Sequence, residues 1–299
     1  MTDTPITSNR QGDNACVAPA DRRHPADGPV TTGQMIVFSP DGTRIACDSR
    51  GSGPHLLLVH GTGAEGAFWR PVRPALEAAF TVHAMDRRGH GESGDAPRYA
   101  IGREYEDVAA CIRAFGPEPV DVVAHSFGAL CVLGARRMGA RVRRLVLYEP
   151  PIPAPDAPYY TGEIIPAMAA AIAAGDAAEA LSLFLTGVHG MRPEDVARLR
   201  RLASWRGRLA SAPRLMRELA AVHGFRFEPA EYTDWQIPTL LLLGGDSPPQ
   251  YRATAAMLHA GLPGSRIGFL PGQSHDAVRA APAMFVDAAV RFLRASTSP

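Results

Sequence analysis

The sequence predicts an α/β protein with a mostly parallel central sheet, flanking helices and an inserted helical cap. Three observations indicate this fold class. Short apolar runs alternate with helix-like stretches over the first half of the chain, the alternation stops between Pro150 and Gln236, and it resumes at Thr239. Such alternation is typical of βαβ units, whose strands are buried on both faces.

The composition is that of an ordinary globular protein, and it excludes several classes of function. The chain has 299 residues, of which 46% are hydrophobic and 20% charged, so it can bury a large core. Its 31 basic and 30 acidic side chains leave a net charge of +1. We therefore expect neither nucleic acid nor a membrane surface as a partner. All the basic residues are arginine, which excludes lysine Schiff bases and P-loop chemistry.

The first residues and the cysteines favour a cytoplasmic protein. Residues 1–33 are rich in Thr, Asp, Pro and Gly and have no apolar stretch of the signal-peptide kind, so we expect a disordered leader. No run approaches the ~20 apolar residues that a membrane span needs. The four cysteines have neither CxxC nor metal-ligand spacing, which favours free thiols in a reducing compartment. They are Cys16, Cys47, Cys111 and Cys131.

The first half of the chain supplies most of the predicted sheet. An Asp41-Gly42 turn joins two apolar runs, Met35 to Phe38 and Arg44 to Cys47, as in a β-hairpin. Further strands are predicted at His55 to Val59, Phe80 to Met85, Val120 to Ala124 and Leu145 to Tyr148. Helices are predicted near Phe68 to Ala78, around Val108 and at Ser126 to Met138.

The second half divides into an insertion and a return to the sheet. A proline-rich segment follows Glu149 and breaks the pattern. Helical stretches are then predicted at Pro166 to Ala174, Asp176 to Thr186 and Pro193 to Trp205. Strands follow at Thr239 to Leu243 and Arg266 to Leu270, with a closing helix at Ala280 to Ala295. We therefore expect a core made of residues 34–149 and 237–299, and a cap made of residues 150–236.

The strongest local motif surrounds Ser126. An apolar strand runs directly into this serine, a helix begins at once, and small residues, Ala124 and Gly128, lie two positions to either side. A sharp, strained strand-to-helix turn needs small neighbours and lifts the hydroxyl above the sheet edge. The motif therefore predicts a nucleophile, although a serine that only caps a buried helix would look similar.

A glycine-containing loop after an earlier strand predicts an oxyanion hole. His60-Gly61-Thr62-Gly63 follows the apolar run that ends at Val59. The backbone N–H of Thr62 can point at the same spot as that of Phe127, the residue after the serine. Two converging backbone donors stabilise the negative charge that develops during acyl transfer.

Two further side chains follow strands near the end of the chain. Asp246 comes after an apolar strand and two glycines, and His275 follows the next strand. An imidazole in such a loop can accept the serine proton, and a carboxylate beside it can hold its tautomer. The order Ser, Asp, His along the chain is the one expected for this arrangement.

With these residues the sequence resembles the α/β-hydrolase family from about Met35 to Leu293. The resemblance also includes the polar segment from Asp86 to Ser93, which we expect to pin neighbouring loops. It implies an α/β-hydrolase fold with Ser126 as nucleophile, His275 as base and Asp246 as acid, and Thr62 and Phe127 as oxyanion donors. Some members place the acid where Glu149 stands, so Glu149 is the alternative to Asp246.

The resemblance implies a serine hydrolase that cleaves a carboxylic ester or lactone of a small-to-medium, mainly apolar molecule. A serine at this strand-to-helix turn, the elbow of the fold, argues against the haloalkane dehalogenases and epoxide hydrolases of this fold, which need a carboxylate nucleophile. Carbon–carbon bond hydrolysis, thioester hydrolysis and cofactor-free perhydrolysis use the same triad and stay open, as does a non-catalytic small-molecule receptor. No metal or organic cofactor is implied, and the oligomeric state is not predicted.

Overall fold

The computed structural model describes Met1 and residues 31–295, except residues 155–162, 189, 203–204 and 210–211. Within these residues an eight-stranded sheet has the order β1-β2-β4-β3-β5-β6-β7-β8. Strands β3 to β8 are mutually parallel, and β2 pairs antiparallel with both of its neighbours, β1 and β4. The strands are β1 (Thr31–Phe38), β2 (Arg44–Gly51), β3 (His55–Val59), β4 (Thr81–Met85), β5 (Val120–His125), β6 (Val142–Tyr148), β7 (Thr239–Gly244) and β8 (Ser265–Leu270). The predicted fold class is confirmed.

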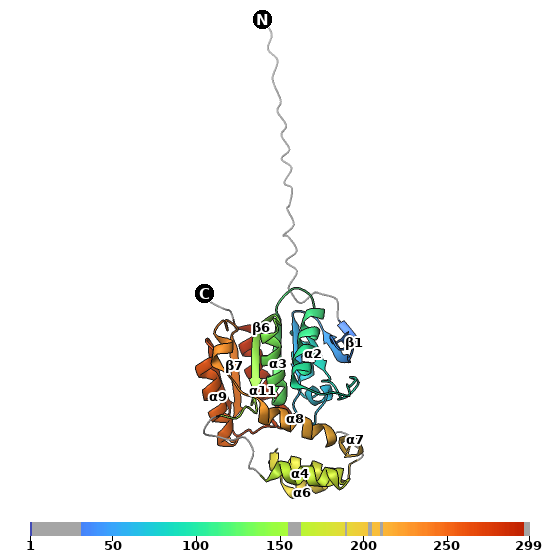
Figure 1. Ribbon diagram of the computed structural model, residues 1–299. Coiled ribbons are helices and arrows are strands. Elements are labelled where there is room, and N and C mark those ends of the chain that lie inside the picture. The colour runs from blue at the N-terminus through green and yellow to red at the C-terminus, as the bar shows by residue number, and fades with distance from the viewer. Residues whose placement is uncertain (2–30, 155–162, 189, 203–204, 210–211, 296–299) are drawn as a thin grey trace.

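Helices cover both faces of the sheet and bury a separate apolar core on each. One core packs under α2 (Ile101–Ala114), α3 (Phe127–Arg137) and α9 (Pro249–Gly261), and the other under α1 (Arg73–Glu77) and α11 (Pro282–Arg294). Strands β3, β4 and β5 are buried almost throughout, because parallel strands between two helical layers have no solvent face. Figure 1 shows α2, α3 and α9 on one side of the sheet and α11 on the other.

The segment between β6 and β7 is helical and lies beyond one end of the sheet (Figure 1). Its side chains form an apolar cluster of their own, which includes Met168, Phe184 and Leu215. We call the described part of residues 150–236 the cap. Its helices are α4 (Ile164–Ala173), α5 (Ala177–Leu183), α6 (Pro193–Leu199), α7 (Trp205–Leu209) and α8 (Ala212–Gly224), with a π-helical turn η2 (Phe184–Val188) and a 3₁₀ turn η3 (Pro229–Tyr232).

Several predicted boundaries need correction. Residues 31–33 belong to β1 rather than to a leader, and residues 2–30 lie outside the described residues. The stretch from Phe68 to Ala78 is a 3₁₀ turn, η1 (Gly66–Trp69), followed by α1. The closing helix is divided into α10 (Ala277–Ala280) and α11, because Pro282 starts a new helix and cannot continue the old one. Helix α9 is an element that the sequence pattern did not predict.

The hairpin and the polar loop after β4 take the expected roles. Gly42 has φ of +82° and turns the chain between β1 and β2. Asp86 accepts the N–H groups of Gly66 and Glu92. Arg88 forms a two-point ion pair with Asp107 on α2, at 2.6 and 2.7 Å, so both side chains fix loops near the end of the sheet.

The described cysteines are reduced thiols inside the core. Cys47, Cys111 and Cys131 are free and buried, and Cys16 lies outside the described residues. Among the described helices, none is long and apolar enough to cross a bilayer.

Candidate active site

Ser126 occupies a strained turn at the end of β5. Its backbone has φ of +53° and ψ of −125°, and α3 begins at the next residue. A non-glycine residue rarely adopts a positive φ unless the surrounding structure holds it there. The side chain makes no capping hydrogen bond to α3, although it stands at the N-cap position. The hydroxyl instead lines a cavity between the sheet and the cap.

The glycines around Ser126 are required by close approach of the backbone. A Cβ on Gly128 would lie 2.5 Å from the carbonyl oxygen of Val59 and 2.7 Å from that of His60. A Cβ on Gly61 would lie 2.8 Å from the Cβ of Ser126. The loop after β3 therefore lies directly against the elbow, as the small residues of the motif predict.

The parallel register brings the other predicted residues to the same edge of the sheet. His125 pairs with Tyr148, and Tyr148 pairs with Leu242. Ser126 directly follows His125 at the end of β5, and Glu149 directly follows Tyr148 at the end of β6. Gly244 and Gly245 lie two and three positions beyond Leu242. They therefore share one end of the sheet, where ligands of open α/β sheets bind.

Glu149 is the carboxylate that contacts His275. Its Oε2 lies 2.7 Å from Nδ1 of the imidazole, and its Oε1 accepts the N–H of Gly244 at 2.7 Å. Glu149 is fully buried, and its φ of +49° turns the side chain toward β7. A carboxylate in this position holds the proton on Nδ1 and leaves Nε2 of the imidazole to act as a base.

Asp246 does not contact His275, so its assignment as the partner of this histidine is corrected to Glu149. Asp246 is exposed, and its carboxylate is absent from the cavity lining. The reason lies in the two glycines before it. A Cβ on Gly244 would lie 2.4 Å from the carbonyl oxygen of Gln273, so the end of β7 packs backbone to backbone against the loop of His275. The chain turns outward before Asp246 is reached.

Neighbouring rings fix the loop that carries His275. The Nε2–H of His125 donates to the carbonyl of His275 at 3.0 Å, and the hydroxyl of Tyr148 donates to the carbonyl of Ser274. Tyr251 stacks on the imidazole with ring centroids 5.1 Å apart. His125 therefore acts in holding the loop, and it stacks on Phe68 at 4.8 Å.

The two expected oxyanion donors lie on either side of Ser126. Phe127 is the first residue of α3, where the helix dipole favours negative charge. Thr62 lines the cavity with Ser126 and His275. Its backbone N–H donates to no group in the described part of the chain, so it is available to a ligand.

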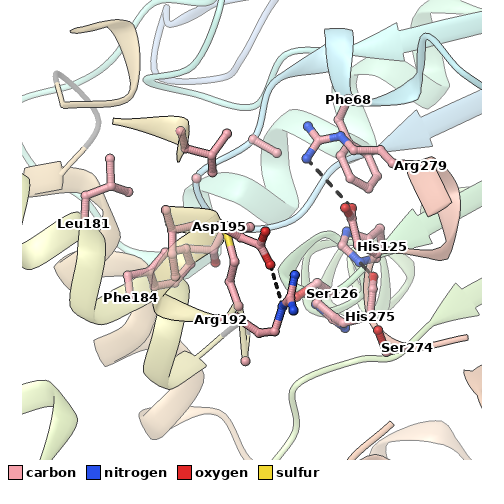
Figure 2. A pocket seen from close by; sticks show the side chains of 18 residues that line it. Phe68, His125, Ser126, Leu181, Phe184, Arg192, Asp195, Ser274, His275 and Arg279 are labelled. Atoms are coloured by element: carbon pink, nitrogen blue, oxygen red, sulfur yellow. Dashed lines mark hydrogen bonds and ion pairs between the residues drawn. The ribbon is translucent and has the colours of Figure 1, made fainter. Parts of the chain in front are cut away.

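The cavity above Ser126 has a volume of 610 Å³ and walls from both the core and the cap. The cap wall is largely apolar, and the core wall carries the reactive side chains (Figure 2). Cap residues in the lining are Leu181, Phe184, Leu185, Gly190, Met191, Arg192, Asp195 and Leu199. Core residues are Thr62, Gly63, Ala64, Phe68, His125, Ser126, Ser274, His275, Asp276 and Arg279.

Two arginines line the cavity, and their ionic partners differ. Arg192 pairs with Asp195 at 2.8 Å and with Glu194 at 3.2 Å. Arg279 lies over the ring of Phe68 at 4.8 Å and is 3.8 Å from Asp276. Figure 2 shows Arg279 on the core side of the cavity and Arg192 on the cap side. Arg279 is therefore the less tightly neutralised of the two cations.

Sequence analysis missed a buried charge cluster beneath the loop of Thr62. Arg87 is fully buried and pairs with Glu104 of α2 at 2.9 Å and with Glu218 of α8 at 2.8 Å. His90 lies 2.7 Å from the same oxygen of Glu218. Burial raises the pKa of Glu104 to about 7. Burial would raise the pKa of Glu218 too, but Arg87 and His90 outweigh it and hold that pKa below its ordinary range. Nothing in the sequence pairs a cap glutamate with a core arginine.

Across the described residues, no three side chains of the His, Cys, Asp and Glu types gather as they would around a metal ion.

Comparison with known proteins identifies the family of the chain. The model of the alpha/beta hydrolase family matches residues 56–288, which is most of the chain. The chain belongs to this family. The sequence is 28% identical over 280 residues to a 2-(acetamidomethylene)succinate hydrolase of Mesorhizobium japonicum, an alignment that covers 89% of this chain and 98% of the relative.

Solved structures give the same result. An alpha/beta hydrolase from Sphaerobacter thermophilus is 36% identical, with a TM-score of 0.75, over 87% of this chain and 100% of that chain. An esterase from Rhodococcus sp. ECU1013 is 25% identical, with a TM-score of 0.70, over 88% of this chain and 99% of that chain. These similarities support a hydrolase activity.

Proposed function

We propose that the protein is a serine hydrolase that cleaves a carboxylic ester or lactone through an acyl-enzyme. The observation that carries the proposal is the 2.7 Å contact between Glu149 and His275, in a cavity that Ser126 also lines. A nucleophile, a base and a group that orients the base are the three parts of such a site.

In the proposed reaction, the Oγ of Ser126 attacks the substrate carbonyl and Nε2 of His275 takes its proton. Glu149 stabilises the imidazolium that forms. The N–H groups of Thr62 and Phe127 donate hydrogen bonds to the oxyanion. These hydrogen bonds strengthen as the tetrahedral intermediate forms. His275 then protonates the leaving alcohol, and a water molecule that it activates releases the acid and restores Ser126.

The cavity supports a small-to-medium substrate with an apolar acyl part. Its 610 Å³ lies within the range of small-molecule pockets, and the cap supplies an aromatic and aliphatic wall that includes Leu181 and Phe184. We assign the acyl chain to this wall. A series of p-nitrophenyl esters of increasing chain length measures the fit: we expect kcat/KM to rise with chain length and then fall once the chain exceeds the cavity.

The same three side chains can perform thioester hydrolysis, perhydrolysis or hydrolysis of a carbon–carbon bond next to a carbonyl. A parallel screen of ester, thioester and vinylogous diketone substrates separates these chemistries. We expect the ester or lactone to give the highest kcat/KM. A diketone that is cleaved faster than any ester assigns the protein to the carbon–carbon hydrolases.

A specific observation favours a substrate that carries a carboxylate. Arg279 lines the cavity on the core side, and the relative from Mesorhizobium japonicum is named for a succinate derivative. Mono-p-nitrophenyl glutarate should be preferred over the neutral p-nitrophenyl valerate, and Arg279→Gln should remove the preference. An unchanged ratio of the two kcat/KM values would exclude this carboxylate subsite and leave the esterase assignment intact.

A fluorophosphonate probe tests the proposal. We expect covalent labelling of the wild type on the peptide that contains Ser126, and none of Ser126→Ala. Absence of labelling in well-folded wild type would favour a non-catalytic small-molecule receptor on this fold.

We further place the activity in the cytoplasm, with a small molecule as the partner and without a cofactor, nucleic acid or membrane. The support is the near-neutral charge of the chain and the thiols of Cys47 and Cys111, which stay free although their sulfur atoms are 3.8 Å apart.

A further inference from the structure

Arg87 contacts the loop that precedes Thr62 and the ring of Phe127, and we assign Thr62 and Phe127 to the oxyanion hole. Its Nε donates to the carbonyl of His60 at 3.0 Å and its Nη2 to the carbonyl of Gly61 at 3.1 Å. Its guanidinium carbon lies 4.6 Å from the ring centroid of Phe127. The side chain is fully buried, so water does not compete for these contacts.

The side chain of His60 also holds the carbonyl group of Gly61. The backbone N–H of Arg87 donates to Nε2 of His60 at 3.1 Å, so Nε2 is the acceptor and the ring proton lies on Nδ1. That Nδ1 is 2.9 Å from the carbonyl oxygen of Gly61. Burial, with Arg87 and His90 nearby, holds the pKa of His60 well below 6.5, which keeps this neutral tautomer. The carbonyl of Gly61 therefore accepts two hydrogen bonds.

A held carbonyl fixes the direction of the N–H in the same peptide unit. The bond between Gly61 and Thr62 is trans, and in a planar trans peptide the C=O and the N–H point in opposite directions. Because Arg87 and His60 hold the oxygen of Gly61 on the buried side, the N–H of Thr62 points to the other side, and Thr62 lines the cavity.

The cap holds Arg87 in turn. Glu218 lies on α8 of the cap, is fully buried, and accepts from Nη2 of Arg87 at 2.8 Å. This is the nitrogen that also donates to Gly61. A second ion pair ties α8 to the core at a different place: Arg217 binds Asp95 at 2.9 and 3.0 Å. That pair does not reach the loop of Thr62.

We propose that Arg87 is a positioning residue that, held by Glu218 of the cap, sets the direction of the Thr62 N–H, so that docking of the cap completes the oxyanion hole. The inference rests on the proposed function, because it takes Thr62 as an oxyanion donor. It assigns to the cap a role in the chemical step as well as in shaping the cavity.

The test compares Glu218→Gln with Asp95→Asn. Each variant removes one charge from an ion pair between α8 and the core, and only the first acts on Arg87. We expect Glu218→Gln to lower kcat roughly 10-fold or more with little change in KM, since a misplaced donor weakens the transition state rather than the bound substrate. Asp95→Asn should keep kcat within about 2-fold, because surface ion pairs contribute little.

A tetrahedral transition-state analogue gives the second readout. A trifluoromethyl ketone should bind Glu218→Gln more weakly by the same factor as the loss in kcat, whereas the binding of the product acid should not change. Equal effects of the two variants, or a loss confined to KM, would overturn the inference.

Circular dichroism checks folding, and Glu218→Asp, which restores the charge, should recover part of kcat. If Glu218→Gln does not fold, Arg87→Lys serves in its place, because one ammonium cannot also make the contacts that Nε of Arg87 makes with the His60 carbonyl and Nη1 makes with Glu104.

The failures of the two proposals are distinguishable. Wild type that reacts with the fluorophosphonate and turns over esters, with Glu218→Gln equally active, overturns the positioning role alone. Wild type that neither reacts nor turns over overturns both.

Discussion

Ser126 and Glu149 are the two non-glycine residues with positive φ in the described part of the chain, at +53° and +49°. Both belong to the proposed triad. Such conformations cost about 1–3 kcal/mol each and persist where the surroundings hold them. The strain is therefore concentrated where two strands deliver their side chains to one point.

The strain at Ser126 can be measured by replacing it with two small residues. Ser126→Gly relieves the positive φ, whereas Ser126→Ala retains the Cβ that causes it. We expect the glycine variant to have a higher free energy of unfolding than the alanine variant by about 1 kcal/mol, after the larger backbone entropy of glycine is offset. Urea unfolding of the two inactive variants gives the difference. Equal stabilities would show that the turn is unstrained.

At the level of single residues, the sequence predicted that Ser126 and His275 meet at one end of the sheet, but it favoured Asp246 over Glu149, the carboxylate that contacts His275. Asp246 and Glu149 both follow strands, and both satisfy the chain order Ser, acid, His. The choice depends on the φ of Glu149 and on the backbone contact of Gly244 with Gln273. These are tertiary features, which strand periodicity does not encode.

Among the elements, the packing of α3 against β3 sets the distance between the elbow and the oxyanion loop. Gly128 is the point of closest approach, 2.5 Å from a carbonyl oxygen for a built Cβ. The strand pattern and the small-residue motif were enough to predict this contact. The division of the Phe68 to Ala78 stretch was not predicted, because short 3₁₀ turns have no distinct periodicity.

Gly128→Ala should move the loop of Thr62. We expect a loss of about 1–3 kcal/mol in unfolding free energy, because a methyl group must displace backbone atoms, together with a drop in kcat. Gly102→Ala is the matched control: it lies in the first turn of α2, and a Cβ there meets nothing within 4 Å. Thermal unfolding and ester turnover measure both. A tolerated Gly128→Ala would contradict the tight contact.

At the scale of the whole molecule, the site lies between the core and the cap, and the cap is inserted between β6 and β7 of the core. The sequence predicted the cap from the interruption of the strand pattern. It did not predict the buried Glu218–Arg87 pair, because a single glutamate on a helix carries no sign of its partner 131 positions away. The helical character of the insertion is thus readable from sequence, whereas α8 and the contacts that join cap to core are not.

A buried histidine, His83, makes the stability of the whole fold depend on pH. His83 on β4 bonds to His55 and Ser49 at 2.8 Å each. Burial, with His55 and Arg73 nearby, lowers the pKa of His83 to about 3. Below pH 6.5 the unfolded chain therefore binds a proton that the folded chain does not, and the free energy of unfolding falls as the pH is lowered.

His83→Gln removes this contribution. Between pH 7.5 and 5, we expect wild type to lose about 1–2 kcal/mol more unfolding free energy than the variant. Urea unfolding at the two pH values measures this, and His223→Gln, at an exposed histidine, is the control. Parallel pH curves for wild type and His83→Gln would refute the assignment.

The most direct measurement for the central claim, that Ser126, His275 and Glu149 act as one unit, is the kcat of Glu149→Gln beside that of Asp246→Asn on the same p-nitrophenyl ester. We expect a loss of about 10³–10⁴-fold for Glu149→Gln, because a glutamine amide cannot hold the proton on Nδ1 as a carboxylate does. We expect a change of less than about 3-fold for Asp246→Asn, since an exposed carboxylate that forms no ion pair with the imidazole contributes little. The reverse result, with Asp246→Asn inactive and Glu149→Gln unimpaired, would contradict it.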